Sequence, residues 1–296
     1  MKKIDTVNQV RSIVETFILF GDPNAPFWLL GLEEGGEPKK GEEKLFISNL
    51  NNKSDRFKRK PGKLSLRDLC GSPKPQNSKD TIHLPNEEAL QAGRGGYRLK
   101  YQRTWGGYIK LLHSIWNIHE QDKTPWSLKK VKEYQEMHLG QQEQISDSIE
   151  IRNKKSCLLE LFPLPHKGRK KGQWPYHVLA KEYPELNFLK DPQTYRSHVL
   201  PQRMTMLINL IKQHKPAYLI CFGDDCKRAF ETIDLQSEKT FEFAHSSKIH
   251  SAKIAYLGNT MIIFSKHPTS YGLPDLYWKN LGAEIQKFSS PTIKAA

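Results

Sequence analysis

Three short apolar runs, separated by stretches with helical periodicity, constrain the fold of this chain more than any other feature. Phe27–Leu30, Ala217–Phe222 and Met261–Phe264 are bounded by Gly, Pro, Asn or Lys and are too short for globular helices. They are typical of buried β-strands, and Cys157–Phe162, which ends at Pro163, is a fourth candidate. Because such strands alternate with helices in α/β proteins, we expect a central, mostly parallel β-sheet flanked by helices on both faces.

The segments between the runs carry apolar residues at three- and four-residue spacing. This periodicity predicts helices at Ile4–Phe20, Thr104–Ile118, Gln202–His214 and Asp225–Ile233. By contrast, Phe46–Leu99 is rich in Lys, Asn, Ser and Pro without sustained periodicity, and we interpret it as a long polar insertion. The chain of 296 residues is long enough for one sizeable core, so we expect a single α/β domain over 1–296 that contains this insertion.

The charge balance restricts the class of partner. The chain has 46 Lys and Arg against 32 Asp and Glu, a formal net charge of +14. This excess favours a polyanion, with nucleic acid ahead of a membrane surface. No apolar stretch approaches a membrane span in length, and no apolar segment follows Met1-Lys2-Lys3, so we expect a cytoplasmic protein without a membrane partner.

The four cysteines, Cys70, Cys157, Cys221 and Cys226, are scattered and form no CxxC pair. This spacing does not suit a disulfide scaffold or a metal cluster, so we expect buried free thiols and no metal. The chain also lacks a Gly-rich dinucleotide motif or a P-loop, and no cofactor is expected.

Two of the apolar runs end in residues that can carry out chemistry. Phe27–Leu30 leads into the acidic, glycine-rich segment 31–36, which contains Glu33, and Met261–Phe264 leads through Ser265 and Lys266 to His267. Open α/β sheets bind ligands at the carboxyl ends of their strands, so the two residues form a candidate acid–electrophile pair. A glycine-rich turn with solvated glutamates, and a structural histidine, are the alternatives.

In their order and spacing, these motifs resemble the uracil-DNA glycosylase superfamily. The resemblance covers Phe27–Gly36 and Ser156–Phe288 and rests on motifs at four strand ends: Gly31-Leu32-Glu33-Glu34-Gly35, Leu159-Glu160-Leu161-Phe162-Pro163, Phe222-Gly223-Asp224-Asp225-Cys226 and His267-Pro268-Thr269-Ser270. It implies a uracil-DNA-glycosylase-like fold and a monofunctional DNA N-glycosylase. Such an enzyme flips a base out of the duplex, cuts its bond to the sugar and leaves an abasic site.

The resemblance assigns the catalytic roles to Glu33 and His267. Breaking the N-glycosidic bond builds positive charge on the sugar and negative charge on the departing base. An anionic Glu33 favours the first charge and can position water, while His267 can donate to O2 of the base. Glu34 remains the alternative carboxylate.

DNA contacts are expected from two loops, and the expected partner is double-stranded DNA, without an obligate protein partner. In the turn after His267, relatives carry a side chain that wedges into the duplex, a role that falls here to Tyr271, and Thr269 and Ser270 can contact phosphate. A basic tract supplies further candidates for phosphate contact, although charge runs are more often only solvated: Lys167, Arg169, Lys170 and Lys171.

Glu160 departs from the pattern of uracil-specific relatives, which have an asparagine at this strand position. An asparagine amide can donate to O4 and accept from N3–H, whereas an ionised carboxylate only accepts. An acceptor suits the N4 amino group of cytosine, and Gly31, Leu32 and Phe162 are the other expected base-binding residues. Alternatively, the alignment is shifted by one or two residues and Glu160 is a structural ion-pair partner.

A pocket for cytosine must select a modified form, because excision of ordinary cytosine would destroy the genome of the host. Such a pocket suggests, within this superfamily, the antiviral glycosylases that remove glucosylated hydroxymethylcytosine from phage DNA. The candidate walls for the sugar are Phe46–Leu99 and the segment Pro163–Tyr176 with Trp174 and Tyr176, although aromatic residues are as often part of the core. A conventional uracil-DNA glycosylase of base-excision repair and a non-catalytic DNA-binding relative are the alternatives.

Overall fold

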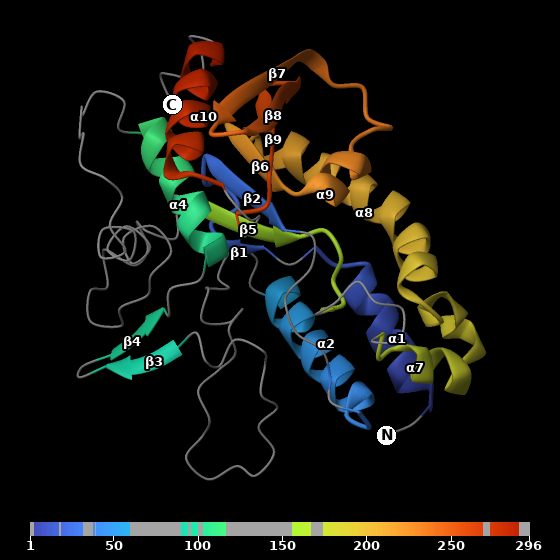
Figure 1. Ribbon diagram of the computed structural model, residues 1–296. Helices are drawn as coiled ribbons and strands as arrows, with labels where there is room; N and C mark the ends of the chain where they lie inside the picture. The colour runs from blue at the N-terminus through green and yellow to red at the C-terminus, as the bar shows by residue number, and fades with distance from the viewer. Residues whose placement is uncertain are drawn as a thin grey trace.

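The fold is built on one seven-stranded sheet in the order β1-β5-β2-β6-β9-β8-β7 (Figure 1). The computed structural model describes residues 3–17, 19–31, 38, 40–59, 90–93, 96–99, 103–116, 156–166, 174–268 and 273–289. The strands of the sheet are β1 (Phe20–Gly21), β2 (Phe27–Gly31), β5 (Ser156–Glu160), β6 (Tyr218–Phe222), β7 (Gln236–His245), β8 (Lys248–Leu257) and β9 (Thr260–Ser265). A separate two-stranded sheet consists of β3 (Leu90–Gly93) and β4 (Gly96–Leu99).

The centre of the large sheet is parallel and its two sides are antiparallel. Strands β5, β2, β6 and β9 run in the same direction, whereas β1, β8 and β7 each pair antiparallel with their neighbours. The prediction of a mostly parallel sheet is therefore correct only for the centre. Strands β7, β8 and β9 follow one another through turns of two residues, and connections this short can only join antiparallel strands.

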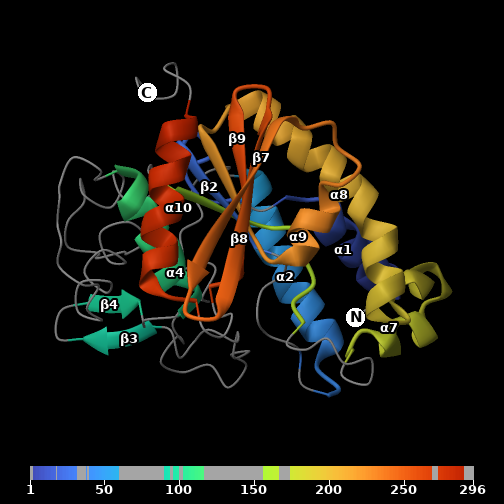
Figure 2. The same cartoon turned by 45° about the horizontal axis from the view of Figure 1, so that its top comes forward.

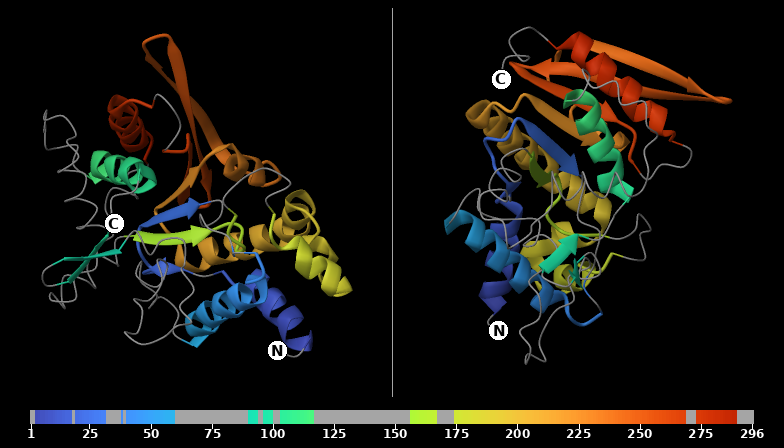
Figure 3. Two further views of the ribbon diagram at one scale, coloured as in Figure 1. Left: turned by 60° about the horizontal axis from the view of Figure 1, so that its bottom comes forward. Right: turned by 90° about the vertical axis from the view of Figure 1, so that its left-hand side faces the viewer.

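Helices cover both faces of the sheet, as predicted (Figures 2 and 3). Trp28 and Leu30 of β2 belong to one core, and Phe27 and Leu29 belong to the other, because successive side chains of a strand point to opposite faces. The first core is closed by α1 (Lys3–Val14), α2 (Glu43–Arg59), α7 (His177–Glu182), the 3-10 helix η3 (Pro184–Leu189), α8 (Pro192–His214) and α9 (Asp224–Ala229). The second is closed by α4 (Arg103–Trp116) and α10 (Asp275–Phe288).

All four predicted strands are confirmed, whereas three predicted helices have different ends. Helix α1 stops at Val14 and Phe20 belongs to β1, and α9 stops at Ala229. Helix α8 begins at Pro192, ahead of the predicted start, because Asp191 caps it by accepting from Thr194 N at 2.9 Å.

The start of the segment interpreted as a polar insertion is a helix of the core. In α2, Phe46, Ile47 and Leu50 are buried and belong to the same core as α1. The segment is therefore regular up to Arg59, although no helical periodicity was identified there, because three apolar side chains on one face pack this otherwise polar helix on the core. Residues 60–89 lie outside the described residues.

Three of the cysteines behave as the sequence predicts. Cys157, Cys221 and Cys226 are buried free thiols, and burial raises the pKa of each. Cys70 lies outside the described residues. Within the described ranges, no helix is both long enough and apolar enough to cross a membrane.

Candidate functional site

The carboxyl ends of the four parallel strands stand level with one another. Gly31 of β2 is opposite Glu160 of β5, and Phe222 of β6 is opposite Ser265 of β9. Strands β2 and β6 pair in register up to Leu30 and Cys221, the residues just before Gly31 and Phe222. The two pairs therefore form one row across the four strands. With neighbouring strands about 4.8 Å apart, the row from Glu160 to Ser265 is roughly 14 Å long.

This row crosses the point where the strand order reverses. After β2 the chain forms β5, which lies beside β2 on one side. The next parallel strand, β6, lies beside β2 on its other side (Figure 1). In open α/β sheets, ligands bind in the crevice outside the carboxyl ends of the strands at such a switch point. The candidate site is therefore this edge of β5, β2, β6 and β9.

The carboxylate of Glu160 lies against the main chain of Gly31. A methyl group built on Gly31 would be 2.6 Å from Glu160 Oε2 and 3.1 Å from Cδ and Oε1. Only glycine permits such a close approach. The missing side chain at Gly31 thus lets the carboxylate lie across the end of the central strand β2.

Arg203 of α8 supports Glu160 from inside the core. Its side chain is 1% exposed, and Nη2 donates to Glu160 O at 2.8 Å while Nε donates to Leu161 O at 2.9 Å. Burial lowers the pKa of Arg203 to about 9, while Tyr195 and the charge of Glu160 act in the opposite direction. The guanidinium is therefore charged at neutral pH. Because the attraction is mutual, it also stabilises the anionic form of Glu160.

Sequence reasoning missed Arg203, although the chain carries a signal for it. The buried residues Val199, Arg203, Leu207 and Ile211 recur at every fourth position of α8. A charged residue in an otherwise apolar stripe of a helix must find partners inside the protein. The spacing alone therefore indicates a buried arginine at this position.

Cys226 of α9 is also affected by the charge of the Glu160 carboxylate. Burial, with a smaller contribution from the charge of Glu160, raises the pKa of the Cys226 thiol to about 12. The thiol lies 3.9 Å from the carbonyl oxygen of Leu30. The raised pKa favours the neutral thiol, which is less reactive than the thiolate.

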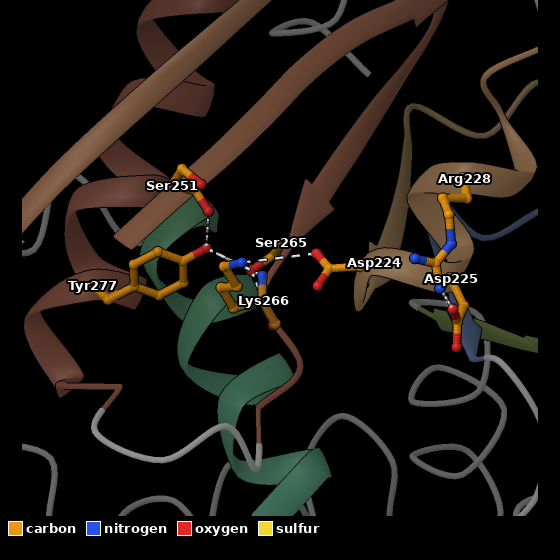
Figure 4. A network of polar contacts seen from close by, with 7 residues as sticks. All are labelled: Asp224, Asp225, Arg228, Ser251, Ser265, Lys266 and Tyr277. Atoms are coloured by element: carbon orange, nitrogen blue, oxygen red, sulfur yellow. Dashed lines mark hydrogen bonds and ion pairs between the residues drawn. The ribbon is translucent and has the colours of Figure 1, made fainter. Parts of the chain in front are cut away.

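The chain that follows β9 is anchored by α10 and by the first residue of α9 (Figure 4). The Tyr277 hydroxyl lies 2.8 Å from Ser265 Oγ and accepts from Lys266 N at 3.4 Å. The ammonium group of Lys266 pairs with Asp224 at 3.7 Å. These contacts hold both residues that precede His267.

His267 lies at the same edge of the sheet and is exposed. Its ring centroid is 6.5 Å from that of Phe222, with the planes inclined by 70°. The next residue, Pro268, packs on α4, where a methyl group on Gly107 would be 2.6 Å from Pro268 Cβ. His267 is therefore presented to solvent between two neighbours that are both held in place.

The structure thus brings Gly31, Glu160 and His267 to one edge of the sheet. Phe162 is only 4% exposed and lies near Tyr195 in the core, so a base can reach only a small part of its ring. The other expected site residues lie outside the described residues, and their roles stay predictions: Leu32, Glu33, Thr269, Ser270, Tyr271, Lys167, Arg169, Lys170 and Lys171.

The two aromatic residues expected to form walls for a sugar belong to the core instead. Trp174 and Tyr176 are 3% and 0% exposed. Trp174 Nε1 donates to Leu189 O at 2.7 Å, and the Tyr176 hydroxyl donates to Pro165 O at 2.9 Å. That expectation is wrong, because their polar atoms are satisfied by the main chain around them.

Neither a metal cluster nor a known relative defines the class of this site. Within the part of the chain that the structure describes, no group of three His, Cys, Asp or Glu residues is placed to hold a metal ion. Comparison of the chain with protein-family models, with curated proteins and with solved structures found no match.

Proposed function

We propose that this protein is a monofunctional DNA glycosylase that excises a modified pyrimidine, with glucosylated hydroxymethylcytosine as the favoured base. The observation that carries the proposal is the Glu160 carboxylate lying over Gly31 at the switch point of the sheet. An ion pair that serves only stability does not need a glycine beneath it at the end of a central strand. The placement therefore favours ligand binding for Glu160.

The polarity of Glu160 supports a cytosine derivative as the ligand. The Arg203 guanidinium nearby favours the anionic form of Glu160, and an ionised carboxylate can only accept hydrogen bonds. The N4 amino group of cytosine is a donor, whereas O4 of uracil is a second acceptor that the carboxylate repels. Ordinary cytosine also carries this amino group, so contacts with the added glucose must provide the remaining selectivity.

Glu160 and His267 suit the two edges of one base. Glu160 ends β5 and His267 follows β9, the two strands at opposite ends of the row of roughly 14 Å. In the proposed complex, Glu160 accepts from N4 and His267 donates to O2. The net charge of +14 provides the attraction for the DNA backbone.

In the proposed reaction, the bond between N1 of the base and C1′ of the sugar breaks and a water molecule adds to C1′. Glu33 favours the positive charge on the sugar and orients the water. His267 stabilises the negative charge on the base, which finally takes up the proton released by the water. No lysine is required as a nucleophile, so the product is an abasic site.

The test uses matched duplexes that carry uracil, cytosine, hydroxymethylcytosine or glucosylated hydroxymethylcytosine, with abasic sites revealed by alkaline strand cleavage. We expect cleavage of the glucosylated duplex and none of the cytosine duplex. A His267→Ala variant should lose this cleavage. His214→Ala is the matched control, because His214 ends α8 and lies near Asn24 ahead of β2, at the opposite edge of the sheet.

Three other outcomes would overturn the proposal. Cleavage of the uracil duplex alone would identify a conventional repair glycosylase. Tight binding without any cleavage would identify a non-catalytic DNA-binding protein. Neither binding nor cleavage would remove DNA as the partner.

A further inference from the structure

Arg203 is a charged side chain inside the core directly behind the candidate site. It is 1% exposed and lies on the buried face of α8, one turn before Leu207. A buried charge is costly unless its hydrogen-bonding groups are satisfied. The partners of Arg203 therefore indicate what its position achieves.

All the hydrogen bonds that the structure gives Arg203 go to main-chain carbonyl groups at the ends of two secondary-structure elements. Nη1 donates to Val14 O at 3.3 Å and to Thr16 O at 2.6 Å, where α1 ends. Nη2 and Nε donate to the carbonyl oxygens of Glu160 and Leu161, where β5 ends. One planar guanidinium thus joins the end of a helix to the end of a strand of the site, which a lysine ammonium cannot reproduce.

Stacking fixes the plane of the guanidinium group, in addition to the hydrogen bonds along its edges. The ring centroid of Phe17 lies 3.6 Å from Arg203 Cζ, so the group stacks on an aromatic face. Donors and stacking together leave the guanidinium one orientation. Its positive charge is therefore fixed relative to the end of β5.

Ionisable groups on the helices behind the site interact electrostatically with the Glu160 carboxylate. Arg203 of α8 attracts it, and the charge of Glu160 in turn contributes to the raised pKa of the Cys226 thiol on α9. Tyr195, also on α8, acts on Arg203. Of these groups, Arg203 is the cation that favours the anionic carboxylate.

We propose that Arg203 is a positioning residue of the site, which fixes the main chain of Glu160 and keeps its carboxylate anionic over Gly31. Arg203 thereby ensures that Glu160 accepts hydrogen bonds and never donates one. The fixed main chain of Glu160, and the guanidinium held beside it, rest on the geometry. Its consequence, selection of an amino-bearing base by a residue that does not touch that base, rests on the proposed glycosylase function.

The first experiment follows the Glu160 carboxyl group directly, by carbon-13 NMR titration with the signal assigned from its loss in Glu160→Gln. Arg203→Gln removes the charge and should raise the midpoint by about one pH unit or more. Arg203→Lys keeps a charge without the planar fork and should give a smaller rise. Leu207→Ala, which destabilises the same face of α8, should leave the midpoint unchanged.

A purely structural arginine would give a different pattern. All three substitutions would then lower the melting temperature without moving the titration, or would move it equally, and either result overturns the proposal. If Arg203→Gln does not fold, Arg203→Lys against Leu207→Ala decides the question. An unchanged midpoint in Arg203→Lys then overturns it.

The second experiment links this role to the proposed reaction. In Arg203→Gln, the pH below which excision of the modified cytosine is lost should rise together with the NMR midpoint. One unit corresponds to about a tenfold loss of rate at a pH below both midpoints. If the midpoint shifts as expected but no duplex is cleaved by any variant, the glycosylase proposal fails while the role of Arg203 stands.

Discussion

Replacing Gly31 with alanine tests the central contact of the site with a single methyl group. That methyl would lie 2.6 Å from Glu160 Oε2, whereas ordinary contacts begin at 3.4 Å. The carboxylate must therefore withdraw by about 0.8 Å to reach an ordinary separation. Because the opposing atom is the end of a flexible side chain, the strand need not move, and the free energy of unfolding should change by less than about 1 kcal/mol.

The withdrawal is large on the scale of a hydrogen bond. A donor–acceptor distance of about 2.9 Å would lengthen to roughly 3.7 Å, beyond the range of a hydrogen bond. Losing a hydrogen bond to a charged group costs about 1.5–3 kcal/mol. Gly31→Ala should therefore lower kcat/KM for the modified cytosine by roughly 10- to 150-fold, measured as abasic-site formation, with a nearly unchanged melting temperature.

A double-mutant cycle with Glu160→Ala separates this contact from any other effect of the methyl group. In the Glu160→Ala background the colliding atoms are gone, so adding Gly31→Ala should cause no further loss of kcat/KM. Equal losses in both backgrounds would refute the reasoning. Gly31 would then act through a different contact.

Three further predictions address selectivity, chemistry and binding. Glu160→Asn should lower excision of the modified cytosine and raise that of uracil, changing their ratio by roughly one to two decades on matched oligonucleotides; an unchanged preference would contradict the role of Glu160. Glu33→Gln and His267→Ala should each lower excision by at least about 100-fold while DNA binding is retained, and wild-type turnover in either would remove that residue from the chemistry. DNA affinity should fall steeply with salt, because Lys and Arg release counterions from phosphates; a flat response in fluorescence anisotropy would indicate another partner.

The centre of the fold was predictable because buried parallel strands leave a strong pattern. Runs such as Ala217–Phe222 are apolar on both faces, since helices cover both sides of the sheet. The hairpin β7–β8 was missed for the opposite reason. Most side chains of β7 are exposed, so the run from Gln236 to His245 lacks an apolar signature.

The sequence predicted the individual strand ends of the candidate site but not the contacts between them. The sequence places Gly31 and Glu160 at strand ends, but their contact depends on the pairing register between β2 and β5, which a single sequence does not reveal. Arg203 is far from Glu160 along the chain and lies on a helix whose other buried residues are mostly apolar. Contacts of this kind arise from tertiary packing and leave little local trace.

The level row of strand ends also determines how the chain tolerates changes in length. Deleting one residue within β5 would turn its remaining side chains to the opposite face of the sheet and remove Glu160 from its place over Gly31. Adding residues between β2 and β5 leaves both strands and their pairing unchanged, and the chain already accommodates the whole stretch 32–155 there. Connections can therefore grow or shrink by many residues around a site that a single missing residue in a strand would abolish.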